Sequence, residues 1–213
     1  MMKKILPILL LCIALYACNS KQVKVACIGD SITEGAGHEQ QSKTAYPVVL
    51  EQLLGADYIV LNAGRSGATM LKESDLSYWN CKEISNVFTY KPDIIIIKLG
   101  TNDSKYHNWN QENFRDDYQR MIDTLNTIDG EPQIYLCLPV PVFETKWGIN
   151  DSTLNYGVIP TIKDIATTNN LSLIDLNTIF LTKPEYFPDA IHPNEKGAEQ
   201  IAIVIADKLK NYK

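Results

Sequence analysis

The sequence has few of the residues on which metal and nucleic-acid chemistry depend. Its 213 residues include only three histidines and five cysteines, and no Cys/His group has the spacing of a zinc site. No acidic loop of the calcium-binding pattern occurs, so we expect no metal and no cofactor. The formal net charge is −5 and no basic run is present, which argues against nucleic acid as a partner.

Internal repeats and low-complexity stretches are also absent. Hydrophobic residues make up 45% of the chain and charged residues 21%, as in ordinary globular proteins. The length suffices for one substantial core with few insertions. We therefore expect a single globular domain.

The N-terminus has the pattern of a bacterial export signal. Lys3 and Lys4 precede an apolar stretch, residues 5–16, that is too short to cross a membrane comfortably. Leu15-Tyr16-Ala17-Cys18 resembles a lipobox. We predict a signal peptide over residues 1–17, a lipidated Cys18, a polar tether over 18–22 and one domain over 23–213. The domain would then face water outside the cytoplasm, at the periplasmic side or the cell surface, held by a lipid anchor. The alternative is an ordinary secretory signal cleaved near Ala17.

The rest of the chain alternates strand-like and helix-like segments. Short apolar, β-branched runs predict strands, whereas apolar residues at helical spacing predict helices. The strands are expected at residues 23–28, 58–61, 93–98, 133–138 and 172–175, and the helices at 45–54, 81–90, 113–128, 156–169 and 194–210. This alternation implies parallel strands joined by right-handed crossovers. Three cysteines remain in this region, and we expect no disulfide among them.

Polar and glycine-rich segments follow the first three predicted strands. Gly29-Asp30-Ser31, residues 62–67 and residues 99–103 all come directly after a strand, and Pro188–Pro193 lies near the C-terminus. The carboxyl ends of parallel strands meet at one edge of the sheet, where ligands bind. Each segment taken alone is equally a tight turn or a helix cap, so their joint arrangement carries the functional argument.

These four segments, in this order, resemble the four sequence blocks of the SGNH hydrolases, also called the GDSL esterase/lipase family. The resemblance implies a flavodoxin-like three-layer α/β/α sandwich with about five parallel strands. It also implies that Ser31 is the nucleophile, that His192 is the general base and that Asp189 orients His192. The oxyanion hole would consist of the Ser31 N–H, the Gly64 N–H and the Asn102 side-chain amide.

The residue types suit this chemistry. Serine needs an adjacent base to become a nucleophile, and histidine can take the proton and return it to the leaving alkoxide. A carboxylate on the other ring nitrogen selects the tautomer. Preorganised donors stabilise the oxyanion of the tetrahedral intermediate.

The expected function is ester hydrolysis through an acyl-enzyme, with an O-acetyl group on carbohydrate as substrate. The blocks resemble those of bacterial sialate O-acetylesterase-type enzymes, and no apolar insertion is long enough to roof an acyl tunnel. Loop aromatics, Trp109 and Trp147 foremost, are the predicted sugar-binding residues. The alternatives are a lysophospholipase or thioesterase on the same fold, a surface carbohydrate-binding lipoprotein without catalysis, and a flavodoxin-like phosphate or flavin binder.

Overall fold

A computed structural model describes residues 21–210 of the chain. The predicted signal peptide, the lipidation of Cys18 and most of the tether lie outside the described residues and stay predictions. Within residues 21–210, no helix is long and apolar enough to cross a membrane. Cys27, Cys81 and Cys137 carry free thiols, in agreement with the expected lack of disulfides among them.

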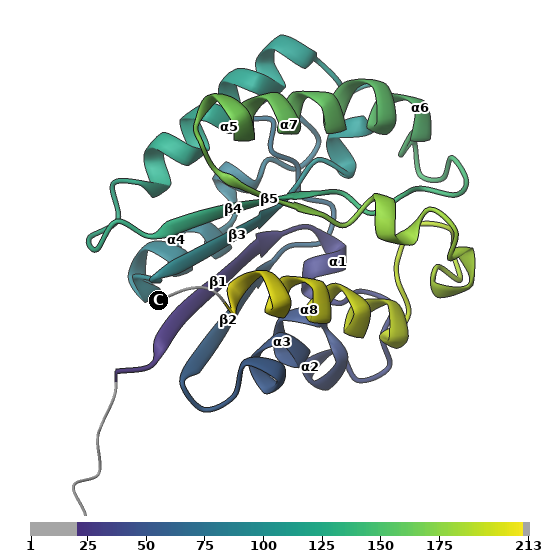
Figure 1. Ribbon diagram of the computed structural model, residues 1–213. Coiled ribbons are helices and arrows are strands. Elements are labelled where there is room, and N and C mark those ends of the chain that lie inside the picture. Colours follow the sequence, from purple (N-terminus) through teal and green to yellow (C-terminus); the bar gives the residue numbers. More distant parts are fainter. Residues whose placement is uncertain (1–20, 211–213) are drawn as a thin grey trace, which may run out of the picture.

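A five-stranded, wholly parallel sheet forms the centre of the molecule (Figure 1). Its strands are β1 (Val23–Gly29), β2 (Tyr58–Gly64), β3 (Ile94–Lys98), β4 (Gln133–Leu138) and β5 (Ser172–Asp175). The spatial order β2-β1-β3-β4-β5 is that of flavodoxin-like sheets. Central strand β3 is buried throughout, which explains its run of four isoleucines. The predicted fold class is confirmed.

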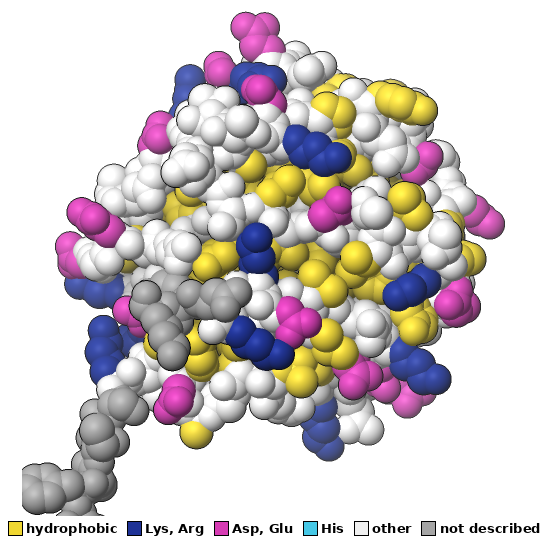
Figure 2. All heavy atoms as spheres, viewed as in Figure 1, with side chains coloured by type: hydrophobic (Ala, Val, Ile, Leu, Met, Phe, Trp, Pro, Cys, Tyr) yellow, Lys and Arg dark blue, Asp and Glu magenta, His cyan; other side chains and the backbone are white. Residues whose placement is uncertain are grey.

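Helices cover both faces of the sheet (Figure 1). Helices α3 (Tyr46–Leu54) and α8 (Glu195–Leu209) enclose one apolar cluster with the sheet. Helices α4 (Lys82–Tyr90), α5 (Gln111–Leu125) and α7 (Ile159–Thr168) enclose the other. In the space-filling view, acidic and basic side chains intermingle and form no large area of one sign on this face (Figure 2).

The predicted helix over 156–169 differs most from the structure. The helical segment starts earlier, at α6 (Asp151–Thr153), and passes through a π-helical turn, Leu154–Val158, before α7 begins. Asn150 caps its start, since its side chain accepts the Thr153 N–H at 2.9 Å. Two four-residue helices, α1 (Ser31–Glu34) and α2 (Gln41–Thr44), were not predicted because they are too short to show a periodicity.

Candidate active site

Ser31 occupies the first position of α1, directly after β1. Asp30 caps this helix, because its Oδ1 accepts the Ile32 N–H at 3.0 Å. Gly35 ends the helix in the left-handed region at φ 89°, where glycine is favoured. The Ser31 N–H belongs to the first helical turn and has no partner within the helix. The short helix therefore presents both the hydroxyl and the N–H of Ser31 at the carboxyl edge of the sheet.

The structure brings Ser31, His192 and Asp189 into one hydrogen-bonded chain. Ser31 Oγ lies 2.8 Å from His192 Nε2, and His192 Nδ1 lies 2.7 Å from Asp189 Oδ2. A carboxylate accepts hydrogen bonds, so Nδ1 carries the proton and Nε2 is left to accept one from Ser31. The three predicted catalytic residues thus have the relative positions that the predicted chemistry requires.

Asp189 is itself fixed by its own turn. Its Oδ1 accepts the N–H of Ile191 at 2.9 Å and that of His192 at 2.7 Å. Partial burial opposes ionisation, but the hydrogen bonds from His192 and Ile191 outweigh it and lower the pKa of Asp189. The carboxylate therefore stays charged and holds the imidazole in place.

The prediction that the Gly64 N–H belongs to the oxyanion hole is wrong. That N–H is donated to Asn62 Oδ1 at 2.9 Å, and Gly64 is the last residue of β2, in register with Gly29. A Cβ at Gly64 would lie 2.2 Å from the backbone nitrogen of Glu34. Glycine is needed there so that β2 can approach α1 closely.

Gly67 fits the role instead, and sequence reasoning missed it. Gly67 lines one cavity with Ser31, Asn102 and His192, and its N–H makes no hydrogen bond within the described part of the chain. The length of the second strand was the signal that could have found Gly67. A strand that begins at residue 58 and pairs with all of residues 23–29 runs to residue 64. The residue that leaves the sheet and turns toward Ser31 must therefore come later.

The turn that carries Gly67 is tied to α1. Glu34 Oε2 accepts the Ser66 N–H at 2.8 Å and also the Ser66 hydroxyl. Asn102 contributes from the other side, where its Nδ2 donates to Ala68 O at 3.1 Å. The second N–H of that amide remains available, since an amide nitrogen has two hydrogens. Three donors, from Ser31, Gly67 and Asn102, thus surround one cavity.

This catalytic cavity has a volume of about 260 Å³. Trp147 forms part of its wall, with its ring centroid 5.6 Å from that of His192 and 57% of the residue exposed. Lys105 forms another part and is held by an ion pair with Asp75 at 2.8 Å. An exposed aromatic face beside His192 fits the predicted role of Trp147 in sugar binding, which stays a prediction.

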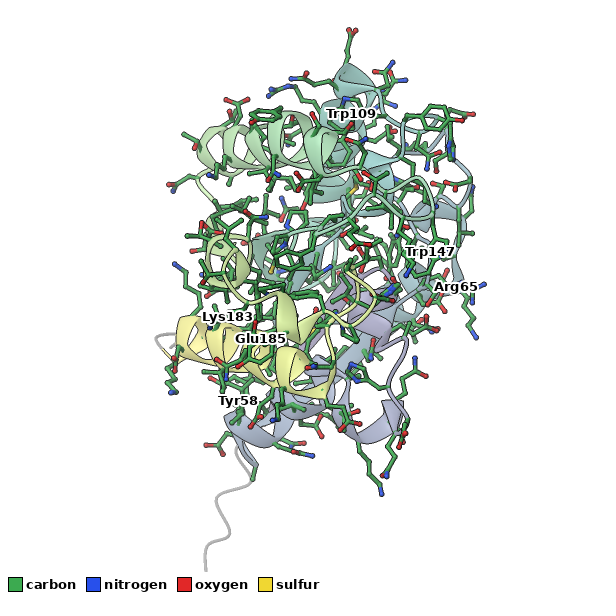
Figure 3. The ribbon with its side chains drawn as sticks, turned by 90° about the vertical axis from the view of Figure 1, so that its right-hand side faces the viewer. Tyr58, Arg65, Trp109, Trp147, Lys183 and Glu185 are labelled. Atoms are coloured by element: carbon green, nitrogen blue, oxygen red, sulfur yellow. The ribbon has the colours of Figure 1, made fainter. Side chains whose placement is uncertain are left out.

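Trp109, the other predicted sugar-binding residue, does not belong to this site. Its ring packs on Phe114 at 5.4 Å between centroids and on Gly157, where a Cβ would lie 2.5 Å from the indole. Figure 3 shows Trp109 well apart from Trp147. The large apolar surface of Trp109 covers the core, so that prediction is wrong.

Asp103, next to Asn102, holds the loop that follows Gly67. Its two carboxylate oxygens accept the N–H groups of Met70 at 3.0 Å and Leu71 at 2.9 Å. The side chain is fully buried. Burial outweighs the hydrogen bonds from backbone N–H groups, and together with the nearby Asp30 carboxylate it raises the pKa of Asp103 to about 7.

This raised pKa predicts a pH-dependent contribution of Asp103 to stability. Above about pH 4 the carboxyl is ionised in the unfolded chain, whereas the folded protein keeps it protonated up to about pH 7. Unfolding releases a proton in this interval, so the stabilisation falls as the pH rises from about 4 to about 7.

We expect the free energy of unfolding of the wild type to exceed that of Asp103→Asn by more at about pH 4.5 than at about pH 7.5. Urea unfolding at the two pH values measures this, with exposed Asp116→Asn as control. A difference that is constant, or larger at high pH, contradicts the prediction.

Known proteins resemble this chain in sequence and in fold. Residues 27–200 match the model of the GDSL-like lipase/acylhydrolase family. The chain belongs to this family. One relative is an acetylxylan esterase of Xylanibacter ruminicola, which is 38% identical to this chain over 207 residues. The match covers 88% of this chain and 43% of the relative. The chain therefore spans less than half the length of that relative.

Solved structures show the same fold. An aryl esterase of M. smegmatis superposes with a TM-score of 0.75 at 21% identity and covers 90% of this chain and 100% of its own. An acetyl xylan esterase superposes with a TM-score of 0.70 at 23% identity and covers 88% of this chain and 100% of its own. A carbohydrate acetylesterase of Sinorhizobium meliloti gives 0.73 at 19% identity, over 89% and 99%. The GDSL-family assignment and the sheet topology therefore agree.

Proposed function

We propose that this GDSL-family chain is a serine esterase that removes O-acetyl groups from carbohydrate. The observation that carries the proposal is the chain of contacts from Ser31 to His192 to Asp189, at 2.8 and 2.7 Å, beside a cavity with three hydrogen-bond donors. A binding protein without catalysis would leave this alignment unexplained. A phosphate or flavin binder would likewise have no use for the paired His192 and Asp189.

The reaction follows from this arrangement in two steps. Ser31 Oγ attacks the acetyl carbonyl carbon while its proton passes to His192 Nε2, and the carbonyl electrons move onto oxygen to form the oxyanion. The N–H groups of Ser31 and Gly67 and the Asn102 amide donate to that oxyanion. His192 then protonates the departing sugar oxygen as the C–O bond breaks. Water, deprotonated by His192, then attacks the acyl-enzyme carbonyl carbon. The bond from that carbon to Ser31 Oγ breaks, His192 returns the proton to Oγ, and acetate leaves.

The size of the catalytic cavity supports acetyl as the acyl group. Its volume of about 260 Å³ is below the roughly 300–1,000 Å³ typical of sites that enclose a drug-sized ligand. An acetyl group and part of one sugar ring fit such a space, whereas a long acyl chain needs an apolar tunnel. The acetylxylan esterase relative makes acetylated xylan the sugar ester that we propose first, ahead of the O-acetyl sialates.

Acyl-chain length decides between this proposal and the lysophospholipase or thioesterase alternative. We expect kcat/KM to be highest for the acetyl ester and to fall through butyryl to octanoyl esters of one aryl alcohol. In an enzyme with an apolar acyl tunnel, each further methylene would instead stabilise the bound ester by about 0.8 kcal/mol and raise kcat/KM roughly fourfold. Hydrolysis of the three esters by the purified protein measures this, and a rise with chain length would favour the lipase-like alternative. Acetate release from acetylated xylo-oligosaccharides and from O-acetyl sialate then tests the sugar.

A further inference from the structure

Two further hollows continue from the catalytic cavity along the surface. The first, of about 290 Å³, shares Ala36 and His192 with the catalytic cavity. The second, of about 370 Å³, shares Asn194 and Glu195 with the first. These two adjoining hollows are here called the acidic groove, which extends from the cavity of Ser31 toward Tyr186. Figure 3 shows Trp147 and Glu185 well apart across this end of the molecule, in keeping with Trp147 lining the catalytic cavity and Glu185 lining the second hollow.

Carboxylates predominate along the acidic groove. Glu39 lines the first hollow, Glu185 lines the second and Glu195 lines both, and all three side chains are exposed. Lys196 is the one lysine or arginine among the residues that line the two hollows. Carboxylates accept hydrogen bonds from hydroxyl groups and repel anionic ligands. The lining therefore suits a neutral, hydroxyl-rich ligand and disfavours phosphate or carboxylate groups.

An aromatic ring is present beside these acceptors. Tyr186, in the wall of the second hollow, is partly exposed, and its ring is fixed edge-on against Phe180 at 6.1 Å between centroids. Aromatic side chains combine an apolar face with a polar tip. A sugar ring has the matching combination of apolar C–H faces and hydroxyls.

Hydrogen bonds that involve backbone groups hold the groove in shape. His38 Nε2 donates to Pro193 O at 3.0 Å, since a carbonyl oxygen can only accept, and this bond joins the loop after α1 to the turn of His192. The Asn194 N–H donates to Tyr186 O at 2.7 Å, and Asn194 Oδ1 caps α8 through the Gly197 N–H at 3.0 Å. Such a preformed groove binds ligand at a low ordering cost.

We propose that the acidic groove binds the neutral sugar residues next to the acetylated one, so that the protein acts on oligosaccharide chains rather than on single sugars. The inference rests on the proposed function and deepens it. The catalytic cavity alone accommodates an acetyl group and part of one sugar ring. The acidic groove adds a hollow that shares His192 with it and a second hollow beyond, each of at least the same size. A neutral chain bound there would place the acetylated residue at Ser31.

The test compares oligosaccharide length on the wild type and on a groove variant. The probes are unacetylated xylose and xylotetraose for binding, and acetylated xylose, acetylated xylotetraose and 4-nitrophenyl acetate for hydrolysis. The groove variant is Glu39→Gln/Glu195→Gln. The control is Glu112→Gln, because Glu112 and Glu195 are both exposed acids in the first turn of a 15-residue helix.

The wild type is expected to bind xylotetraose at least about tenfold more tightly than xylose, from a few added hydrogen bonds. In the groove variant, kcat/KM for acetylated xylotetraose should fall at least about fivefold relative to kcat/KM for 4-nitrophenyl acetate. Glu112→Gln should leave this ratio at its wild-type value.

Three results overturn the inference. They are equal affinity for xylose and xylotetraose, an unchanged ratio in the groove variant, and an equal loss in Glu112→Gln. Failure of the proposed function is a separate result, because a protein that is not an esterase leaves 4-nitrophenyl acetate intact. The binding titration then still decides whether the acidic groove binds the sugar chain.

Discussion

Replacing Ser31 with alanine is expected to lower kcat/KM for acetyl ester hydrolysis by about 10⁴-fold or more, because the variant has no nucleophile for the acyl-enzyme. Stability should change by no more than about 0.5 kcal/mol, since Ser31 is partly exposed and alanine favours helices. The hydroxyl of Ser31 contacts His192, so its loss leaves the packing of α1 intact. Acetate release and thermal unfolding of the purified variant measure the two effects.

Ser66→Ala is the matched control for this variant. Ser66 lines the same cavity, but its hydroxyl is bonded to Glu34, so it is not aligned with the base. We expect Ser66→Ala to keep most of the activity. Near-wild-type turnover in Ser31→Ala, or an equal loss in both variants, would show that the nucleophile has been misassigned.

The buried ion pair behind Ser31 predicts the largest effect on stability. Lys98 Nζ lies 3.1 Å from Asp30 Oδ1, and the two side chains are 1% and 0% exposed. Lys98→Met removes the cation and leaves the Asp30 carboxylate buried without its charged partner, which typically costs about 3–5 kcal/mol. At roughly 2–4 °C per kcal/mol for a chain of this size, Tm should fall by about 10 °C. Thermal and urea unfolding measure the loss.

A double-mutant cycle separates the charge from the packing. Asp30→Asn should also destabilise the protein, because it leaves the Lys98 ammonium buried without a carboxylate. In Asp30→Asn/Lys98→Met neither charge of the pair remains and asparagine still caps α1, so the double variant should be more stable than the sum of the single effects predicts. Strictly additive losses would contradict the proposed pairing energy. Asp30 directly precedes Ser31 and Lys98 is the last residue of β3, so we also expect Lys98→Met to reduce activity through the position of Ser31.

The elements of the fold followed from local sequence patterns. The run of isoleucines over residues 94–97 predicts a buried strand whatever surrounds it, and the predicted strands at 133–138 and 172–175 have the bounds of β4 and β5. The strand at residue 58 was predicted three residues too short, because Asn62-Ala63-Gly64 reads as a turn and only its pairing with β1 makes it strand. Pairing depends on the partner strand, which local periodicity does not contain.

For the active site, the sequence by itself determined which residues are chemically competent, and the tertiary structure decided which of them meet. Ser31, Asn102, Asp189 and His192 were predictable because their residue types and order resemble a family pattern. The sequence favoured Gly64 for the oxyanion hole, but in the structure the Gly64 N–H is already donated to Asn62 Oδ1, so Gly67 takes that place. Trp109 and Trp147 were equivalent as sequence, and only the packing against Phe114 and Gly157 placed Trp109 over the core. The acidic groove combines residues 36–39 with residues 185–196, and only the folded chain brings these loops together because no local pattern links them.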